Sequence, residues 1–169
     1  TLNPLKHVDI VGILLPLTLI FLGIPAIGWA KPVPVNYRNL KNGKISIFFV
    51  AIAGIVTNLI LAIIAALVYK TLFTSSYFDR YLFEISEIAS YALSLNVLLA
   101  SFNILPIPPL DGSKILTLFL NKKYEYKYLI LEKYGFLIIL ILIWTNILDK
   151  VLNPIHYFFV RIIKLITGV

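Results

Sequence analysis

The chain has 169 residues, of which 60% are hydrophobic and only 14% charged, and its mean hydropathy is +0.93. Soluble domains have about 45–50% apolar and about 25% charged residues, so these polar side chains are too few to cover the chain in water. The lack of cysteine excludes disulfides and thiolate metal sites. The net charge of +7 lies in short loops between apolar runs, which is typical of loops facing anionic lipid. The composition therefore predicts a lipid bilayer as solvent and no nucleic-acid partner.

Four apolar runs are long enough to cross a bilayer core of about 30 Å, which takes roughly 20 helical residues. They cover approximately residues 10–29, 45–69, 82–105 and 129–148. The first run contains Pro16, Gly23 and Pro25, so we expect it to be kinked or re-entrant. The sequence thus predicts an all-α polytopic membrane protein with about four transmembrane helices.

The tail at 150–169 sets basic residues among Ile, Val and Phe and opens near Asn153-Pro154. Such a pattern predicts a C-terminal amphipathic helix at the membrane interface, and the basic residues argue against a fifth span. The absence of an internal repeat or low-complexity linker predicts a single membrane-embedded domain over 1–169.

Loops 31–44 and 106–133 lie on the same side if all four runs cross the membrane. They carry more Lys and Arg than the opposite side, so the positive-inside rule predicts that they face the cytoplasm. Loop 31–44 alternates Pro and Val before an Asn42-Gly43 turn. This pattern fits a stiff connector, or alternatively an edge strand able to hold an unfolded substrate.

The segment 103–112 places three prolines within four residues, shortly before an acidic residue and a glycine. Because prolines remove backbone donors and clash with the preceding turn, they predict a broken helix that delivers Asp111 near membrane depth. A carboxylate there is costly unless it binds a cation or a partner, which makes it a functional hypothesis. Alternatively, Asp111 caps a helix beginning at Gly112 or Ser113, and Asn103 joins neighbouring helices.

The pattern Asn-x-x-Pro-x-Pro-x-Leu-Asp-Gly strongly resembles the second signature of the site-2 protease family, the intramembrane zinc metalloproteases. Its fixed positions are filled by Asn103, Pro106, Pro108, Leu110, Asp111 and Gly112. The phrases at 2–9, 28–36 and 53–58 are similar to landmarks of the short bacterial branch, with Gly54 and Asn58 in the last. The resemblance covers residues 1 to about 120 and departs at Ile55, where the family commonly has proline.

This resemblance implies a zinc-dependent endopeptidase that hydrolyses peptide bonds in or near transmembrane segments of a membrane-protein or membrane-proximal substrate. It implies a peptidase-like domain in the cell membrane of a prokaryote. In the family pattern Asp111 is a zinc ligand, while Asn103 lies near the active site and orients substrate or stabilises an oxyanion. Pro106, Pro108, Leu110 and Gly112 would position the motif.

The family's remaining two zinc ligands and its general base come from a His-Glu-x-x-His helix, a motif that these residues do not contain. His7 and His156 are the histidines present, and we predict that neither binds metal. The sequence also has no methionine. We therefore expect that the chain lacks its N-terminal region, including that helix, and that these 169 residues alone do not hold catalytic zinc.

Two alternatives stay open. A family member could keep the fold and bind substrate without cutting it, or the chain could be a non-enzymatic transporter or channel subunit, a class that also uses broken helices. A serine-type intramembrane protease is disfavoured because no Gly-x-Ser-Gly phrase occurs. Glu84 and Glu87 are i, i+3 neighbours that could form a second metal or proton site, or simply be solvated at the interface. The sequence does not indicate an oligomeric state.

Overall fold

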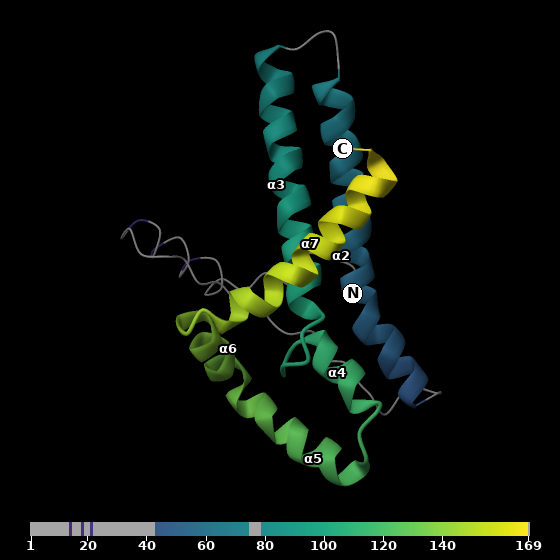
Figure 1. The fold of residues 1–169 in the computed structure, drawn as a ribbon, viewed down its shortest axis with the longest axis vertical. Helices are drawn as coiled ribbons and strands as arrows, with labels where there is room; N and C mark the ends of the chain where they lie inside the picture. Colours follow the sequence, from purple (N-terminus) through teal and green to yellow (C-terminus); the bar gives the residue numbers. More distant parts are fainter. Residues whose placement is uncertain (1–13, 15–17, 19–20, 22–42, 75–78, 169) are drawn as a thin grey trace. The chain divides into compact units, whose positions relative to one another are not determined.

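The structure, a computed structural model, describes residues 14, 18, 21, 43–74 and 79–168, and its regular elements there are all helices (Figure 1). These are α2 (Lys44–Phe73), α3 (Arg80–Asn103), α4 (Asp111–Thr117), α5 (Lys122–Ile130), the 3-10 helix η3 (Leu131–Tyr134), α6 (Gly135–Trp144) and α7 (Ile147–Thr167). The predicted all-α class is confirmed. The chain divides into two units, Thr1–Asn39 and Leu40–Val169, and the helices from α2 to α7 belong to the second.

Several predictions concern residues outside those that the structure describes. They include the kinked or re-entrant first run, most of loop 31–44, the motif phrases at 2–9 and 28–36, and His7. The single-domain organisation of the chain also stays a prediction.

Helices α2 and α3 are both long and apolar enough to cross a membrane, and they match the predicted runs 45–69 and 82–105. The α3 helix begins where the Asp79 carboxylate accepts a hydrogen bond from the Leu82 N–H at 2.9 Å, an N-cap that satisfies a free backbone donor. It ends at Asn103, three residues before the first proline of the motif. The two helices lie side by side (Figure 1).

Apart from Ile55 and Val97, the buried residues of α2 and α3 are small, and many of the large apolar side chains point outward. The buried small residues are Ala51, Ala62, Ala65 and Ala66 on α2 and Ser86, Ala89, Ala100 and Ser101 on α3. Bulky residues such as Ile60, Ile64 and Ile88 are instead more than half exposed. Small residues between helices allow the backbones to approach closely, and an apolar exterior suits lipid. The arrangement is that of a membrane helix pair.

The predicted fourth span, 129–148, is not one continuous helix. Its residues are divided among α5, η3, α6 and α7, with a break at Thr145 and Asn146. Asn146 has a φ of 56°, a left-handed conformation that asparagine adopts more readily than most residues, and the axis bends by 88° there. The described residues therefore contain two membrane-length helices, or three if the bent segment 122–167 crosses as one broken span. The predicted number of four is not confirmed.

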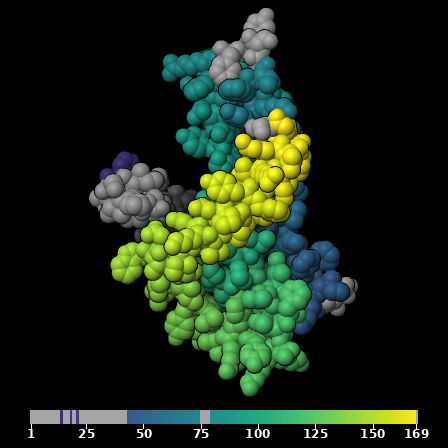
Figure 2. All heavy atoms as spheres, in the orientation of Figure 1, coloured from purple at the N-terminus to yellow at the C-terminus, as the bar shows by residue number. Residues whose placement is uncertain are grey.

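Helix α7 is the predicted C-terminal amphipathic helix, although it begins at Ile147, before the predicted opening near Asn153-Pro154. Pro154 lies inside the helix, where it removes one backbone donor without ending the helix. The buried face consists of Leu148, Leu152, Phe159, Ile163 and Thr167. Figures 1 and 2 show α7 crossing over α2 and α3. At its end, the Lys70 ammonium of α2 donates to the Thr167 carbonyl at 2.7 Å, which satisfies a free carbonyl of the last turn.

Candidate active site

Between α3 and α4 the chain forms a compact turn that we call the Pro loop, residues 104–110. Its prolines have no N–H, and the two amides among residues 106–110 are both bonded within the loop. The Ile107 N–H donates to the Leu105 carbonyl at 2.8 Å, and the Leu110 N–H donates to the Ile107 carbonyl at 2.9 Å. Because these donors are satisfied, the non-helical backbone of residues 106–110 lies between two helices without an unpaired N–H group. The predicted helix break at the motif is confirmed.

Asp111 is the first residue of α4, so the alternative that it caps a later-starting helix is wrong. Leu110 occupies the N-cap position, because α4 begins one residue earlier than that alternative required. The Asp111 carboxylate instead accepts a hydrogen bond from the Lys114 ammonium at 3.0 Å, and the two side chains are 28% and 31% exposed. A carboxylate in a first helical turn is also favoured by the helix dipole.

The structure brings Gly54 of α2 next to this carboxylate, although the two residues are far apart in the sequence. A Cβ atom added to Gly54 would lie 3.2 Å from Oδ2 of Asp111. The missing side chain at position 54 therefore leaves the room that the carboxylate occupies. Asn58 lies one turn further along the same face of α2 and is half-buried.

Gly112 is required where α4 packs against the start of the Pro loop. A Cβ at this position would collide with the Ile104 carbonyl group and lie 2.6 Å from the Leu105 carbonyl oxygen. Glycine thus permits the close backbone contact that fixes the first turn of α4. Of the other motif residues, Pro108 is buried, Leu110 packs on the cluster that contains Leu105, and Pro106 is exposed.

The Pro loop is also contacted by α5 and α6, through two residues that the sequence analysis did not identify. The Tyr128 hydroxyl of α5 donates to the Pro106 carbonyl at 2.5 Å. A Cβ on Gly135 would collide with the Pro108 carbonyl and lie 2.7 Å from Cδ of Pro109.

The far end of α4 is also held. The Lys44 ammonium at the start of α2 donates to the Leu118 carbonyl at 3.0 Å, just past the last residue of α4. A lysine at this position satisfies a free carbonyl and complements the negative end of the helix dipole. The membrane-length helix α2 therefore meets α4 near both ends of α4, through Gly54 and through Lys44.

The remaining candidate residues lie as follows. Asn103 is the half-buried last residue of α3, and its predicted role in orienting substrate or an oxyanion stays a prediction. Glu84 and Glu87 are both exposed, and the Glu84 carboxylate pairs with Arg80 at 3.2 Å. His156 lies on α7, and its Nδ1 is buried without a hydrogen-bonding partner in the part of the chain that the structure describes.

Asp111 fits one position of a zinc site, because it is a partly exposed carboxylate held at a helix start. A catalytic zinc site needs three protein ligands. Over residues 43–74 and 79–168, no group of three His, Cys, Asp or Glu side chains lies together. The described residues therefore offer Asp111 as a candidate ligand without a complete set, and its ligand assignment stays a prediction.

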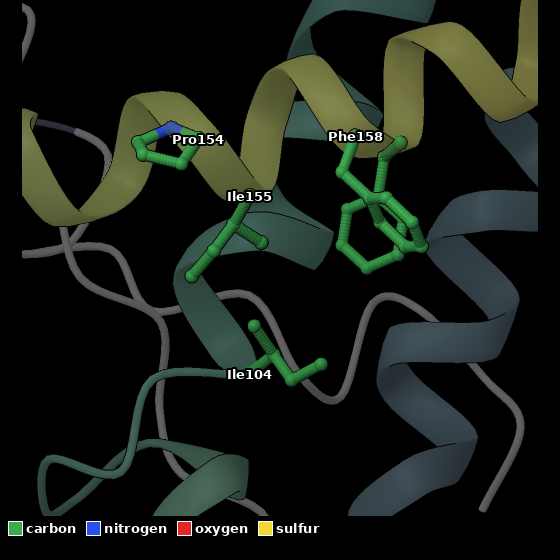
Figure 3. A pocket seen from close by; sticks show the side chains of 5 residues that line it. Ile104, Pro154, Ile155 and Phe158 are labelled. Carbon is green, nitrogen blue, oxygen red and sulfur yellow. The ribbon is translucent and has the colours of Figure 1, made fainter.

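An apolar pocket lies beside the motif, where the end of α3 meets α7 (Figure 3). Its volume is about 450 Å³, and its lining consists of Ile104, Pro154, Ile155, Phe158 and Phe159. Because none of these side chains can ionise or bind metal, the pocket does not supply the chemistry of the site.

These features define a helical membrane protein in which a proline-broken helix presents a carboxylate beside a glycine of a membrane-length helix. Residues 81–144 match the family described as "Peptidase family M50". The chain is also 36% identical over 156 residues to the Bacillus subtilis (strain 168) protein named "Putative zinc metalloprotease YwhC", an alignment that covers 91% of this chain and 68% of that protein. No solved structure matches the chain. The chain therefore belongs to peptidase family M50, which confirms the resemblance to the site-2 proteases.

Proposed function

We propose that the protein is a zinc-dependent intramembrane endopeptidase of the site-2 protease type, with Asp111 as one of its zinc ligands. The substrate is a peptide bond in or near a transmembrane segment of another protein, in the cell membrane of a prokaryote. The observation that carries this proposal is the position of the Asp111 carboxylate, set by a helix break in the family motif and backed by Gly54 of α2. Bound zinc would lower the pKa of a water molecule and polarise the scissile carbonyl.

The residues of this chain contribute position and environment to that site. The close contact of Gly112 with the carbonyls of the Pro loop fixes the backbone that carries Asp111. The Lys114 ammonium neutralises the Asp111 carboxylate, which lowers the cost of a negative charge beside the membrane. A bound zinc ion would take the place of the ammonium. Asn103, eight positions before Asp111 and at the end of α3, would contact the substrate.

The proposal is tested with the protein expressed from its complete reading frame and reconstituted in vesicles with a transmembrane peptide substrate. We expect zinc-dependent cleavage that Asp111→Asn abolishes while the variant still inserts. Asp149→Asn is the matched control, because Asp149 is an exposed acid on α7 far along the sequence from the motif. Undiminished cleavage by Asp111→Asn would sink the ligand assignment. A wild-type protein that binds substrate without cutting it would favour an inactive family member.

A further inference from the structure

The Pro loop is contacted by the segment 122–135, which follows the family motif in the sequence. Two contacts make this connection, and they meet the loop at different places. The Tyr128 hydroxyl donates to the Pro106 carbonyl at 2.5 Å, across 22 positions of sequence. Gly135 lies directly against the Pro108 carbonyl and the Pro109 ring, so closely that no side chain fits there.

The hydrogen bond from Tyr128 reaches a part of the loop that has little else to hold it. Pro106 is exposed, so side-chain packing contributes less to its position than it does for the buried Pro108. As a proline it has no N–H with which to join the loop's internal bonds. The bond is exposed, but it restricts the backbone at its acceptor and therefore favours one loop conformation.

The loop in turn determines where Asp111 lies. Leu110 is the N-cap of α4, and its N–H bonds the Ile107 carbonyl, so a movement of the loop is passed to the first turn of α4. The carboxylate is held at Oδ1 by the Lys114 ammonium, and its Oδ2 lies in the space left open by Gly54, 3.2 Å from where a Cβ would stand. Small changes in ligand position are costly for a metal site, and groups that hold ligands typically change metal affinity by about 10–100-fold when removed.

We propose that Tyr128 is a positioning residue of the active site, which fixes the Pro loop through the Pro106 carbonyl and thereby the Asp111 carboxylate. The inference rests on the proposed function, since it assigns to Tyr128 a role toward the same zinc site. Tyr128 is the tyrosine of α5 whose hydroxyl bonds to the Pro loop. The other two tyrosines of this helix, Tyr124 and Tyr126, are 58% and 70% exposed. The same helix therefore offers a matched control.

The test compares Tyr128→Phe with Tyr126→Phe in the protein expressed from its complete reading frame. Each variant loses one hydroxyl group from α5, and only the first loses the bond to the Pro loop. The first measurement is amide hydrogen exchange at Ile107 and Leu110, the two N–H groups among residues 106–110. We expect Tyr128→Phe to accelerate their exchange about 5-fold or more, with no change in α3, and Tyr126→Phe to leave both unchanged.

The second measurement is zinc affinity by competition with a chelator, and the third is the kinetics of cleavage. We expect Tyr128→Phe to weaken zinc binding about 10-fold and to lower kcat with little change in KM, because the substrate-binding surface is intact. Tyr126→Phe should match the wild type in both.

The outcomes separate the two proposals. If the wild type neither binds zinc nor cleaves, the proposed function fails, while the exchange of Ile107 and Leu110 still reports on the tether. If the wild type is active and Tyr128→Phe equals Tyr126→Phe in exchange and affinity, the positioning role of Tyr128 is wrong. Faster exchange throughout α3 as well would also overturn it, because Tyr128 would then support the fold as a whole.

Discussion

The α2–α3 pair and the region from the Pro loop to α4 are held together by different physical means. The buried residues of α2 and α3 are mostly alanine and serine, with Ile55 and Val97, and several of them pack in one apolar cluster. The Pro loop and α4 depend on glycines pressed against carbonyl groups and on hydrogen bonds to single backbone atoms. A change of one methyl group should leave zinc affinity unchanged in the first region and weaken zinc binding in the second.

The largest expected effect is that of Gly112→Ala. The new Cβ collides with the Ile104 carbonyl, so either α4 or the Pro loop has to shift. We expect a loss of about 1–3 kcal/mol of stability, as for other overpacked sites, and a loss of zinc binding of about 100-fold. Thermal unfolding and chelator competition measure the two effects.

The matched change in the α2–α3 pair is Ala62→Gly, which removes the methyl group of a fully buried residue of α2. It should cost about 1 kcal/mol through helix propensity and leave zinc affinity unchanged. Equal effects of Gly112→Ala and Ala62→Gly on zinc affinity would remove the distinction between the two regions.

An intermediate effect is expected for Gly54→Ala, where the two regions meet. Its Cβ would lie 3.2 Å from Oδ2 of Asp111, so the carboxylate has to move by a few tenths of an ångström. Alanine also favours the helix over glycine by about 0.8–1.0 kcal/mol. We therefore expect a protein at least as stable as the wild type that binds zinc about 3- to 10-fold more weakly. Lower stability together with unchanged zinc affinity would contradict the placement of Gly54 beside the carboxylate.

The smallest effect is expected for Lys114→Met. The ammonium competes with a cation for the Asp111 carboxylate and repels it, so its removal should strengthen zinc binding. Ion pairs with solvent access contribute about 0.2–1 kcal/mol, which corresponds to a gain of about 1.4- to 5-fold in affinity. Lys122→Met at the exposed start of α5 is the control and should change little. Weaker zinc binding by Lys114→Met would show that the lysine supports the site.

The sequence alone was informative where local chemistry decides the structure. Long apolar runs predicted α2 and α3, and three prolines predicted the break before Asp111, because both features depend on neighbouring residues. The run 129–148 was predicted to be one span, and this prediction is not confirmed. Its hydrophobicity is that of a span, but the left-handed turn at Asn146 and the packing of α7 across α2 and α3 divide it.

The support of the site could not be predicted, because its contacts join residues that are distant in the chain. Neither Tyr128 nor Gly135 has a local pattern that marks it as a neighbour of the Pro loop. The approach of Gly54 to Asp111 likewise depends on how α2 packs against α4. The family pattern pointed to Gly54 as a landmark, but the reason for a glycine there became visible only in three dimensions.

The central claim is that Asp111 is a zinc ligand, and its most direct test is zinc retention against a graded chelator. The measurement uses the protein expressed from its complete reading frame, with Asp111→Asn compared with the wild type and with Asp149→Asn. We expect wild type and Asp149→Asn to keep equimolar zinc at chelator concentrations that strip Asp111→Asn, because an amide is a much weaker ligand than a carboxylate. If all three proteins keep zinc equally, Asp111 is not a ligand and the proposed site is wrong.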